Sequence, residues 1–361
     1  MKKVCIFCGE KPVNKNKEHV IPKWLIELTG DPKRVANICK DGDKYIAYAW
    51  QSYTFPACEE CNSYYSDLEA KTKLIIENLI AEKSITHKDF NIFLDWLDKV
   101  RIGVWLGNLM LLKVDLDPNY FIKQRIGTKD RICVLYKIKG NEKGISLIGT
   151  HTQIFEASPS CFGLIINDLV IFNFSKELII SKNIGFPYPN NYHYDKDFVI
   201  IDKIVNGTSE ISYPIIDSLL FKPAIRFYQS IITSNGKFVR PQFGKTYNYF
   251  KNNCYKFSKS LVKSRILVVD ENSDFDEFWN DKTSYQFKFP EKFEKDLIIP
   301  MICQMVLEQQ NNFINNDRKY YLDTNSTESE KREKSFDFLI WQNNIELDYL
   351  KELLAPFTIR I

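Results

Sequence analysis

Four cysteines near the N-terminus have the residue type and spacing needed to bind a metal ion. Cys5 and Cys8 form one C-x-x-C pair, and Cys58 and Cys61 form a second pair further along the chain. Two such thiolate pairs can occupy the four corners of a tetrahedral zinc site. A zinc ion closed by four thiolates has no open position for water, so the spacing predicts a structural zinc ion.

Other features of the cysteines support a metal site over other roles. Gly9 follows the first pair and is expected to adopt the positive φ that a tight turn requires. The alternatives are two unrelated pairs or a redox C-x-x-C motif, but a redox motif needs only one pair. Cys39 lies between the pairs and is either a substitute ligand or a small buried apolar residue. The other cysteines lie in or beside apolar runs, which indicates core positions: Cys133, Cys161, Cys254 and Cys303.

A carboxylate followed by a histidine lies between the two cysteine pairs. Glu18 directly precedes His19, and a neutral imidazole near pH 7 is suited to taking a proton from water. Asn62 directly follows the second pair, and Asp67 and Glu69 come shortly after it. Carboxylate oxygens are ligands that Mg²⁺ and Mn²⁺ prefer. The alternative roles are a structural histidine, solvated carboxylates and, for Asn62, a helix N-cap.

The order C-x-x-C, E-H-V-I-P, C-x-x-C-N in residues 1–75 resembles the HNH endonucleases, the zinc-bearing branch of the ββα-metal (His-Me finger) nucleases. The resemblance implies a hairpin near residues 16–22 and a helix that begins near Asn62. It also implies that His19 is the general base, and that Glu18, Asn62 and Asp67 bind a catalytic Mg²⁺ or Mn²⁺ ion. The implied reaction is hydrolysis of a phosphodiester to 5′-phosphate and 3′-hydroxyl ends.

The sequence departs from the family pattern at two places. Family members often carry an asparagine shortly before the second pair, whereas residues 38–57 contain none. The final histidine of the family name is also missing, and Asn62, Asp67 or Glu69 would replace it.

The remaining residues, 76–361, are expected to form a larger region of recognition or regulation. Apolar spacing predicts helices over residues 70–112, with a second start near His87, and residues 76–112 would form a helical connector. Helical patterns return at residues 291–311 and 335–354.

Short β-branched and aromatic runs alternate with turn residues in the middle of the chain, which predicts a mainly antiparallel sheet. Asn167 and Asp168 are expected to form a hairpin turn. The fold class is therefore α+β, with a small N-terminal zinc-stabilised ββα-metal module before the larger region. The predicted strands are residues 132–138, 146–149, 162–166, 169–174 and 198–204.

Residues 222–265 contain ten basic residues, no acidic residue and nine aromatic residues. Basic side chains can neutralise phosphates and rings can stack on bases, so the stretch is typical of nucleic-acid binding. The alternative is a strand-and-loop region with a solvated basic face and the rings in the core. The candidate contacts are Lys237, Arg240, Lys245, Lys251, Lys256 and Lys259.

Composition excludes several classes of protein. The chain has 361 residues, of which 44% are hydrophobic and 26% charged, with a net charge of +3. This balance excludes a mainly disordered chain and a polybasic nucleic-acid coat. No apolar run reaches the roughly 20 residues of a membrane-spanning helix, and residues 1–12 lack the apolar core of a signal peptide. A cytoplasmic protein without membrane contact is expected.

These observations favour a metal-dependent HNH endonuclease that cleaves DNA. Its C-terminal region would recognise the target or respond to a regulatory ligand or partner protein, as in restriction or phage defence. The alternative is a non-catalytic zinc-containing protein that binds DNA or a partner and has a decayed HNH site. An RNA substrate is a third interpretation, because DNA is preferred only through the family.

Overall fold

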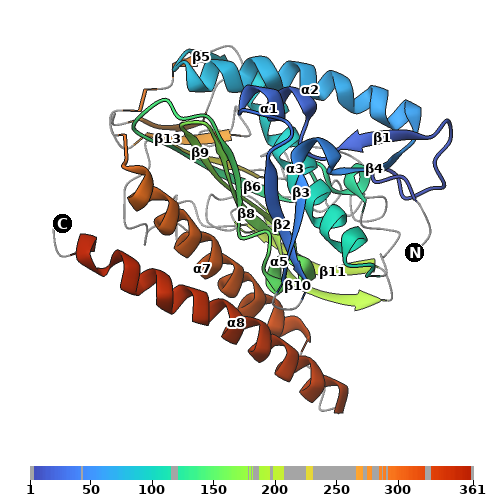
Figure 1. The fold of residues 1–361 in the computed structure, drawn as a ribbon. Coiled ribbons are helices and arrows are strands. Elements are labelled where there is room, and N and C mark those ends of the chain that lie inside the picture. The colour runs from blue at the N-terminus through green and yellow to red at the C-terminus, as the bar shows by residue number, and fades with distance from the viewer. Residues whose placement is uncertain are drawn as a thin grey trace.

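The computed structural model combines helices with antiparallel sheets, so the predicted α+β class is confirmed (Figure 1). Five β-sheets occur among the described residues, and every pairing between named strands is antiparallel. The description covers residues 4–41, 44–114, 121–177, 179, 181, 187–195, 198–206, 225–230, 266–270, 275–278, 284–286, 288–289, 292–321 and 327–358.

The N-terminal part contains two paired strands followed directly by a long helix. β1 (Asn16–His19) pairs antiparallel with β4 (Thr54–Ala57), and α2 (Glu59–Ile80) follows β4 after one residue. The strand β1 ends at His19, three residues before Pro22, which is consistent with the expected end of an extended segment near a proline. Between the two strands lie α1 (Lys23–Leu28), β2 (Val35–Asp41), β3 (Lys44–Ala49) and the 3₁₀ turn η1 (Trp50–Ser52).

A second long helix, α3 (His87–Leu111), follows α2 after the short strand β5 (Ser84–Thr86). The start of α3 at His87 is the one predicted. Thr86 caps it, because the Thr86 hydroxyl accepts a hydrogen bond from the Asp89 backbone and the Asp89 carboxylate accepts one from Thr86. The short helix α4 (Ile122–Arg125) lies further along.

The main sheet has seven strands in the order β14-β13-β12-β6-β9-β8-β7. Predicted strands correspond to β6, β7, β8 and β9, and Asn167 in the β8–β9 turn has a positive φ of 56°. β12 lies inside the basic stretch, for which strands were expected only under the alternative interpretation. The strands are β6 (Asp130–Lys137), β7 (Ile145–Ile148), β8 (Cys161–Ile166), β9 (Leu169–Lys176), β12 (Ile225–Gln229), β13 (Ile266–Asp270) and β14 (Phe275–Phe278). A separate ribbon pairs β10 (Pro187–Asp195) with β11 (Phe198–Asn206), and β15 (Ser284–Gln286) pairs with β5.

The sheet carries a hydrophobic core on each face. In β6, Cys133 and Leu135 join the cluster formed with α3 and the N-terminal segment. The alternating residues Ile132, Val134 and Tyr136 join the cluster formed with the helix that covers the opposite face. The N-terminal segment therefore packs into the same core as the sheet, and the predicted boundary after residue 75 falls inside α2.

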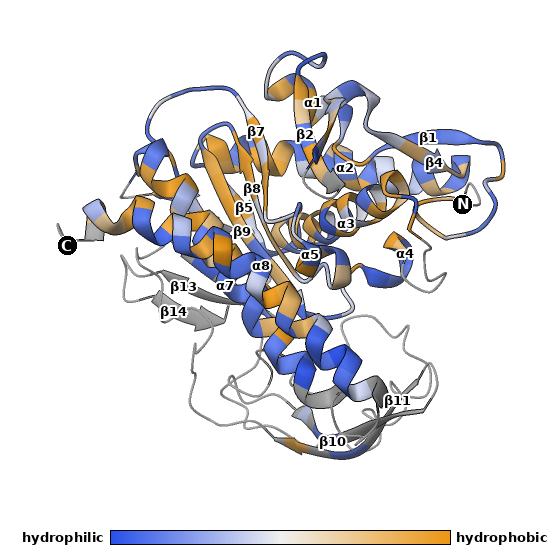
Figure 2. Cartoon of the chain, turned by 60° about the horizontal axis from the view of Figure 1, so that its bottom comes forward, coloured by the Kyte–Doolittle hydropathy of each residue, from blue (hydrophilic) through white to orange (hydrophobic). Residues whose placement is uncertain are grey.

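Two C-terminal helices complete the fold. α7 (Lys295–Tyr321) covers the second face of the sheet, and α8 (Thr327–Thr358) packs along α7 (Figures 1 and 2). The short helix α5 (Gln153–Ala157) contacts both. In the described part of the chain, no helix combines the length and the apolar content needed to cross a membrane.

Candidate metal centre and candidate hydrolytic site

The two predicted cysteine pairs come together in space. The sulfur atoms of Cys5, Cys8, Cys58 and Cys61 all lie within 4.8 Å of one another, and those of Cys8 and Cys58 are 3.9 Å apart. Tetrahedral zinc–sulfur bonds of about 2.3 Å place neighbouring sulfurs about 3.8 Å apart. This four-cysteine cluster can therefore hold a metal ion such as zinc, and Cys39 is a buried residue outside it.

Local backbone geometry brings the cluster together. The Gly9 amide donates to the Cys5 carbonyl at 2.8 Å, and Gly9 has the expected positive φ, at 81°. A β-carbon at this position would also lie 2.4 Å from the ring of Phe121. The Ile6 amide donates to the Pro56 carbonyl at 2.9 Å, which ties the first pair to β4.

The electrostatics of the four-cysteine cluster favour a bound cation. Burial raises the pKa of the Cys8 thiol to about 11 and also raises the pKa of the Cys61 thiol. Burial acts on Cys5 in the same direction, but hydrogen bonds from backbone amides, that of Cys58 first, lower its pKa overall. Four thiolates at one point repel one another, so they need the positive charge of a metal ion to be stable together.

His19 is the last residue of β1 and lies opposite Thr54 of β4. Its ring is half-buried, and burial lowers its pKa below the ordinary value of 6.5. A hydrogen bond to the Gln51 backbone and the nearby Glu69 carboxylate act in the opposite direction. At neutral pH the imidazole is therefore uncharged and can accept a proton.

Glu18 and His19 point to opposite sides of β1, as neighbours in a strand must. Glu18 is buried, and its carboxylate accepts a hydrogen bond of 2.5 Å from the ammonium of Lys99 on α3. The same ammonium contacts the carboxylate of Glu69 on α2. Glu18, Glu69 and Lys99 thus form a carboxylate–lysine cluster that links β1, α2 and α3.

The charges within the carboxylate–lysine cluster depend on one another. Burial lowers the pKa of Lys99, but Glu18 and Glu69 raise it by more, so the ammonium stays charged. Burial raises the pKa of Glu18, and the Lys99 charge opposes this effect. Replacing Lys99 therefore leaves two carboxylates without their counter-ion, whereas replacing either carboxylate leaves Lys99 paired with the other.

The helical phase of α2 determines whether Asp67 or Glu69 reaches the carboxylate–lysine cluster. At 100° per residue, Glu69 lies on the same face as Asn62 and the buried Tyr65, whereas Asp67 lies roughly 140° from Asn62. Asp67 is exposed and forms a 2.5 Å ion pair with Lys71 on the outer face. The structure therefore brings Glu69 to Glu18 and Lys99, and places Asp67 away from the buried face.

Asn62 does not cap the helix. α2 begins at Glu59, three residues before the predicted start, and Cys58 occupies the N-cap position. The Asn62 amide donates to the Cys58 carbonyl at 3.0 Å as part of the first helical turn, and its side chain is half-exposed. The pair Cys58 and Cys61, which can hold a metal ion together with Cys5 and Cys8, thus lies at the start of α2.

The predicted ligands of a catalytic divalent cation do not meet as one group. Glu18 is engaged by Lys99 and Asp67 lies on the outer face of α2. Across the described ranges, the four cysteines are the one group of three or more His, Cys, Asp or Glu side chains close enough to share an ion. As these side chains stand, they do not fit Mg²⁺ or Mn²⁺, because Lys99 supplies the positive charge between the carboxylates.

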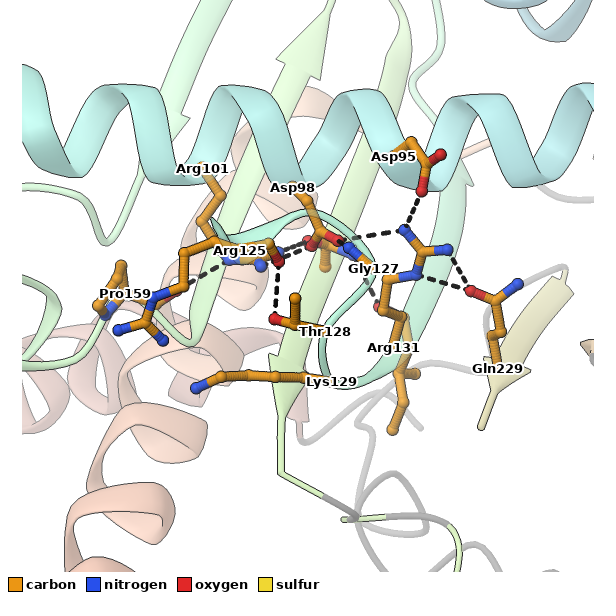
Figure 3. A network of polar contacts seen from close by, with 12 residues as sticks. Asp95, Asp98, Arg101, Arg125, Gly127, Thr128, Lys129, Arg131, Pro159 and Gln229 are labelled. Atoms are coloured by element: carbon orange, nitrogen blue, oxygen red, sulfur yellow. Dashed lines mark hydrogen bonds and ion pairs between the residues drawn. The ribbon is translucent and has the colours of Figure 1, made fainter. Parts of the chain in front are cut away.

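Sequence reasoning missed Lys99. Its signal was a lysine next to the apolar Val100 in a helix with buried apolar residues on both sides of it in the sequence, where burial of a charge demands a partner. The residue before it, Asp98, is also buried, and its carboxylate accepts hydrogen bonds from Arg101 at 2.6 Å and Arg131 at 3.1 Å (Figure 3).

This second polar network fixes α3 to the sheet. Arg131 on β6 also bonds Asp95 at 2.8 Å and donates to Gln229 on β12 (Figure 3). Arg101 donates to the Asn173 side chain on β9. Because Asp98 and Lys99 are adjacent, the helix held by this network is also the one that delivers Lys99 to Glu18.

The predicted nucleic-acid contacts Lys237, Arg240, Lys245, Lys251, Lys256 and Lys259 lie outside the described residues. Two aromatic residues of the same stretch are described. Phe227 and Tyr228 in β12 are buried and belong to the cores on opposite faces of the sheet. For these two rings, the core interpretation is confirmed.

Comparison with protein-family models, with curated proteins and with solved structures finds no match for this chain. The resemblance to HNH endonucleases therefore rests on the residues themselves.

Proposed function

We propose that this protein is a phosphodiester hydrolase of the HNH type that cleaves DNA, with a structural zinc ion in the four-cysteine cluster. The observation that carries the proposal is the position of His19: a half-exposed neutral imidazole at the end of β1, with α2 following the paired strand β4. The motif order around it supports the same class.

In the proposed reaction His19 takes a proton from a water molecule, whose oxygen attacks the phosphorus atom. The bond from phosphorus to the 3′-oxygen breaks, and the leaving oxygen takes a proton from solvent. The Gln51 backbone orients the imidazole through its hydrogen bond. The charges of Glu69 and Lys99 both act on the imidazole of His19.

A second candidate function is a zinc-containing DNA- or partner-binding protein without catalysis. The engagement of Glu18 by Lys99 favours this alternative, because a carboxylate held by an ammonium is not free to bind a catalytic metal ion. The two functions differ in whether His19 is needed for bond cleavage.

The test is cleavage of supercoiled plasmid DNA by purified wild-type protein and by the variant His19→Ala, each with Mg²⁺, with Mn²⁺ and with EDTA. We expect wild type to nick or linearise the plasmid and His19→Ala to lose at least 100-fold in rate, the usual scale of general-base catalysis. The EDTA arm measures the metal requirement that the family resemblance implies.

The matched control is His151→Ala, because His151 is also half-buried and pairs with a carboxylate, that of Glu346, at 3.1 Å. It should cleave at the wild-type rate. Equal cleavage by wild type and His19→Ala would overturn the role of His19. If both proteins bind DNA but cleave neither double-stranded DNA, single-stranded DNA nor RNA, the result would favour the non-catalytic alternative.

A further inference from the structure

The segment that leads into His19 is basic and exposed. Residues 11–17 contain three lysines and no acidic residue, and the side chains of Lys11, Lys15 and Lys17 are all exposed. Within the described residues, none of these three lysines has an ion-pair partner. Exposed charges of one sign without partners attract ions of the opposite sign.

Two of these lysines align with His19 in the alternation of an extended chain. Lys17 and His19 share one face of β1, and Glu18 lies on the other. The strand pairing agrees, because the β4 residue opposite Glu18 is the buried Phe55, whereas those opposite Lys17 and His19 are partly exposed. Lys15 directly precedes β1 and is the next position of the same alternation. We call Lys15 and Lys17 the lysine row.

The opposite face of the β1–β4 ribbon is used for packing and fixes the direction of the row. A β-carbon at Gly107 of α3 would lie 2.8 Å from the ring of Phe55, so the ribbon and α3 are in close contact. Glu18 bonds Lys99 on the same helix. A shift of the strand by one residue would bury a lysine in this contact, so the lysine row is held on the outer face.

Nearby carboxylates do not neutralise the lysine row. Glu18 is turned away from it and is engaged by Lys99. Glu59 and Glu60 are exposed in the first turn of α2, where they complement the helix dipole, and in the described part of the chain neither pairs with a lysine of the row. Side chains two residues apart on a strand stand about 7 Å apart. An extended polyanion that lies along β1 therefore passes both ammonium groups before it reaches His19.

We infer that the lysine row binds backbone phosphates of the DNA strand that continues from the bond beside His19, so that the DNA runs along the outer face of the β1–β4 ribbon. The inference deepens the proposed function and rests on it. Lysine ammonium groups bind phosphates as point charges and read no base. The row therefore supplies affinity and sets the position of the strand, and it adds no sequence preference.

The inference is tested by the salt dependence of DNA binding. Binding of a labelled duplex is measured in EDTA with His19→Ala protein, so that cleavage does not interfere. Adding Lys15→Gln/Lys17→Gln should reduce the slope of log affinity against log salt by about 2, because each duplex phosphate contact contributes about 0.9. At about 0.1 M salt the affinity should fall about 50-fold. The loss should be equal for A·T-rich and G·C-rich duplexes.

Two controls make the test specific to the charge and place of the row. Lys15→Arg/Lys17→Arg keeps both charges and should retain the slope and the affinity. Lys83→Gln/Lys88→Gln also removes two exposed lysines that have no ion pair among the described residues. These two lysines flank β5, at the opposite end of α2 from β1, so binding should be unchanged (Figure 1). All these positions are exposed, and circular dichroism should match that of the parent protein.

A cleavage arm separates the inference from the proposed function. With His19 intact, Lys15→Gln/Lys17→Gln should need more plasmid for half-maximal cleavage, while the rate at saturating plasmid stays near that of wild type. A slope and affinity unchanged by Lys15→Gln/Lys17→Gln would overturn the inference even if wild type cleaves DNA. An equal loss in Lys83→Gln/Lys88→Gln, or tighter lysine-dependent binding of RNA than of DNA, would overturn it as well. The expected loss in a protein that never cleaves would uphold the row and reject hydrolysis by His19.

Discussion

The Lys99 ammonium nitrogen lies 2.5 Å from the Oε1 oxygen of Glu18, although 81 residues separate them in the chain. Glu18 belongs to the strand that carries the proposed base, and Lys99 belongs to a helix fixed to the main sheet. The candidate site is therefore shared between the N-terminal segment and the region that follows. Residues 1–75 alone lack Lys99, the counter-ion of Glu18.

The Lys99→Met variant should be destabilised by about 3–5 kcal/mol, because two buried carboxylates lose their shared ammonium. The matched control is Lys71→Met, whose carboxylate partner Asp67 is exposed, and whose loss should cost less than about 1 kcal/mol. Urea unfolding of both variants measures the difference. Equal losses would contradict the central role of Lys99. Adding Glu18→Gln to Lys99→Met should restore part of the stability.

Glu69 and Asp67 differ in where α2 places them, so their neutral variants should differ in activity. We expect Glu69→Gln to reduce plasmid cleavage at least tenfold, because it removes a charge that acts on both His19 and Lys99. Asp67→Asn should cleave at the wild-type rate, since Asp67 contacts Lys71 on the outer face. The reverse result would show that Asp67 is the functional carboxylate.

The four-cysteine cluster predicts one tightly bound zinc ion per chain. Elemental analysis of Cys58→Ser should show loss of most of this zinc, and its N-terminal segment should become sensitive to protease, because metal binding and folding are coupled at such sites. Cys39→Ala is the control, since Cys39 is buried but lies outside the cluster, and it should keep full zinc content. Equal zinc in both variants would remove Cys58 from the ligand set.

Asp98 anchors α3 through two arginines, and Asp98→Asn should therefore cost about 3 kcal/mol of stability. The arginines lower the pKa of Asp98, so this stabilisation is present above the ordinary pKa of 3.8 and is lost as the pH falls further. Asp348→Asn removes an exposed pair with Lys351 and should change stability by less than about 0.5 kcal/mol. Denaturant titrations at pH 7 distinguish the two.

Burial raises the pKa of Glu156 from its ordinary value of 4.5 to about 7. Between these values the unfolded chain loses the Glu156 proton while the folded protein keeps it, so this residue lowers stability as the pH rises from 4.5 to 7. Glu156→Gln should therefore be as stable as wild type near pH 4 and more stable by about 1–3 kcal/mol at pH 8. A difference that does not change with pH would contradict this assignment.

Local patterns in the sequence were sufficient to predict several elements of the structure. The two C-x-x-C pairs come together because each pair is a local turn, and the strands β6, β8 and β9 follow β-branched runs with clear turn residues between them. The start of α3 is also local, since Thr86 and Asp89 form its cap. In these cases neighbouring residues determine the structure.

Other features depend on partners that are distant in the chain. β12 is a strand because β6 and β13 lie on either side of it, and its own sequence reads as part of a basic stretch. The choice between Asp67 and Glu69 depends on which face of α2 packs inward, and this is the face of the buried Tyr65. Lys99 matters only because Glu18 and Glu69 reach it through tertiary packing.

The position of β12 has a consequence for folding of the chain during its synthesis. β6 lies between β9 and β12, and all eight of its residues are buried. Synthesis delivers β6 and β9 well before β12, so a nascent chain can close only one side of β6 until residue 229 has left the ribosome. During that interval the other side offers unpaired backbone groups on an apolar strand. A chaperone, or another nascent copy of the chain, would therefore bind first at this unpaired edge of β6.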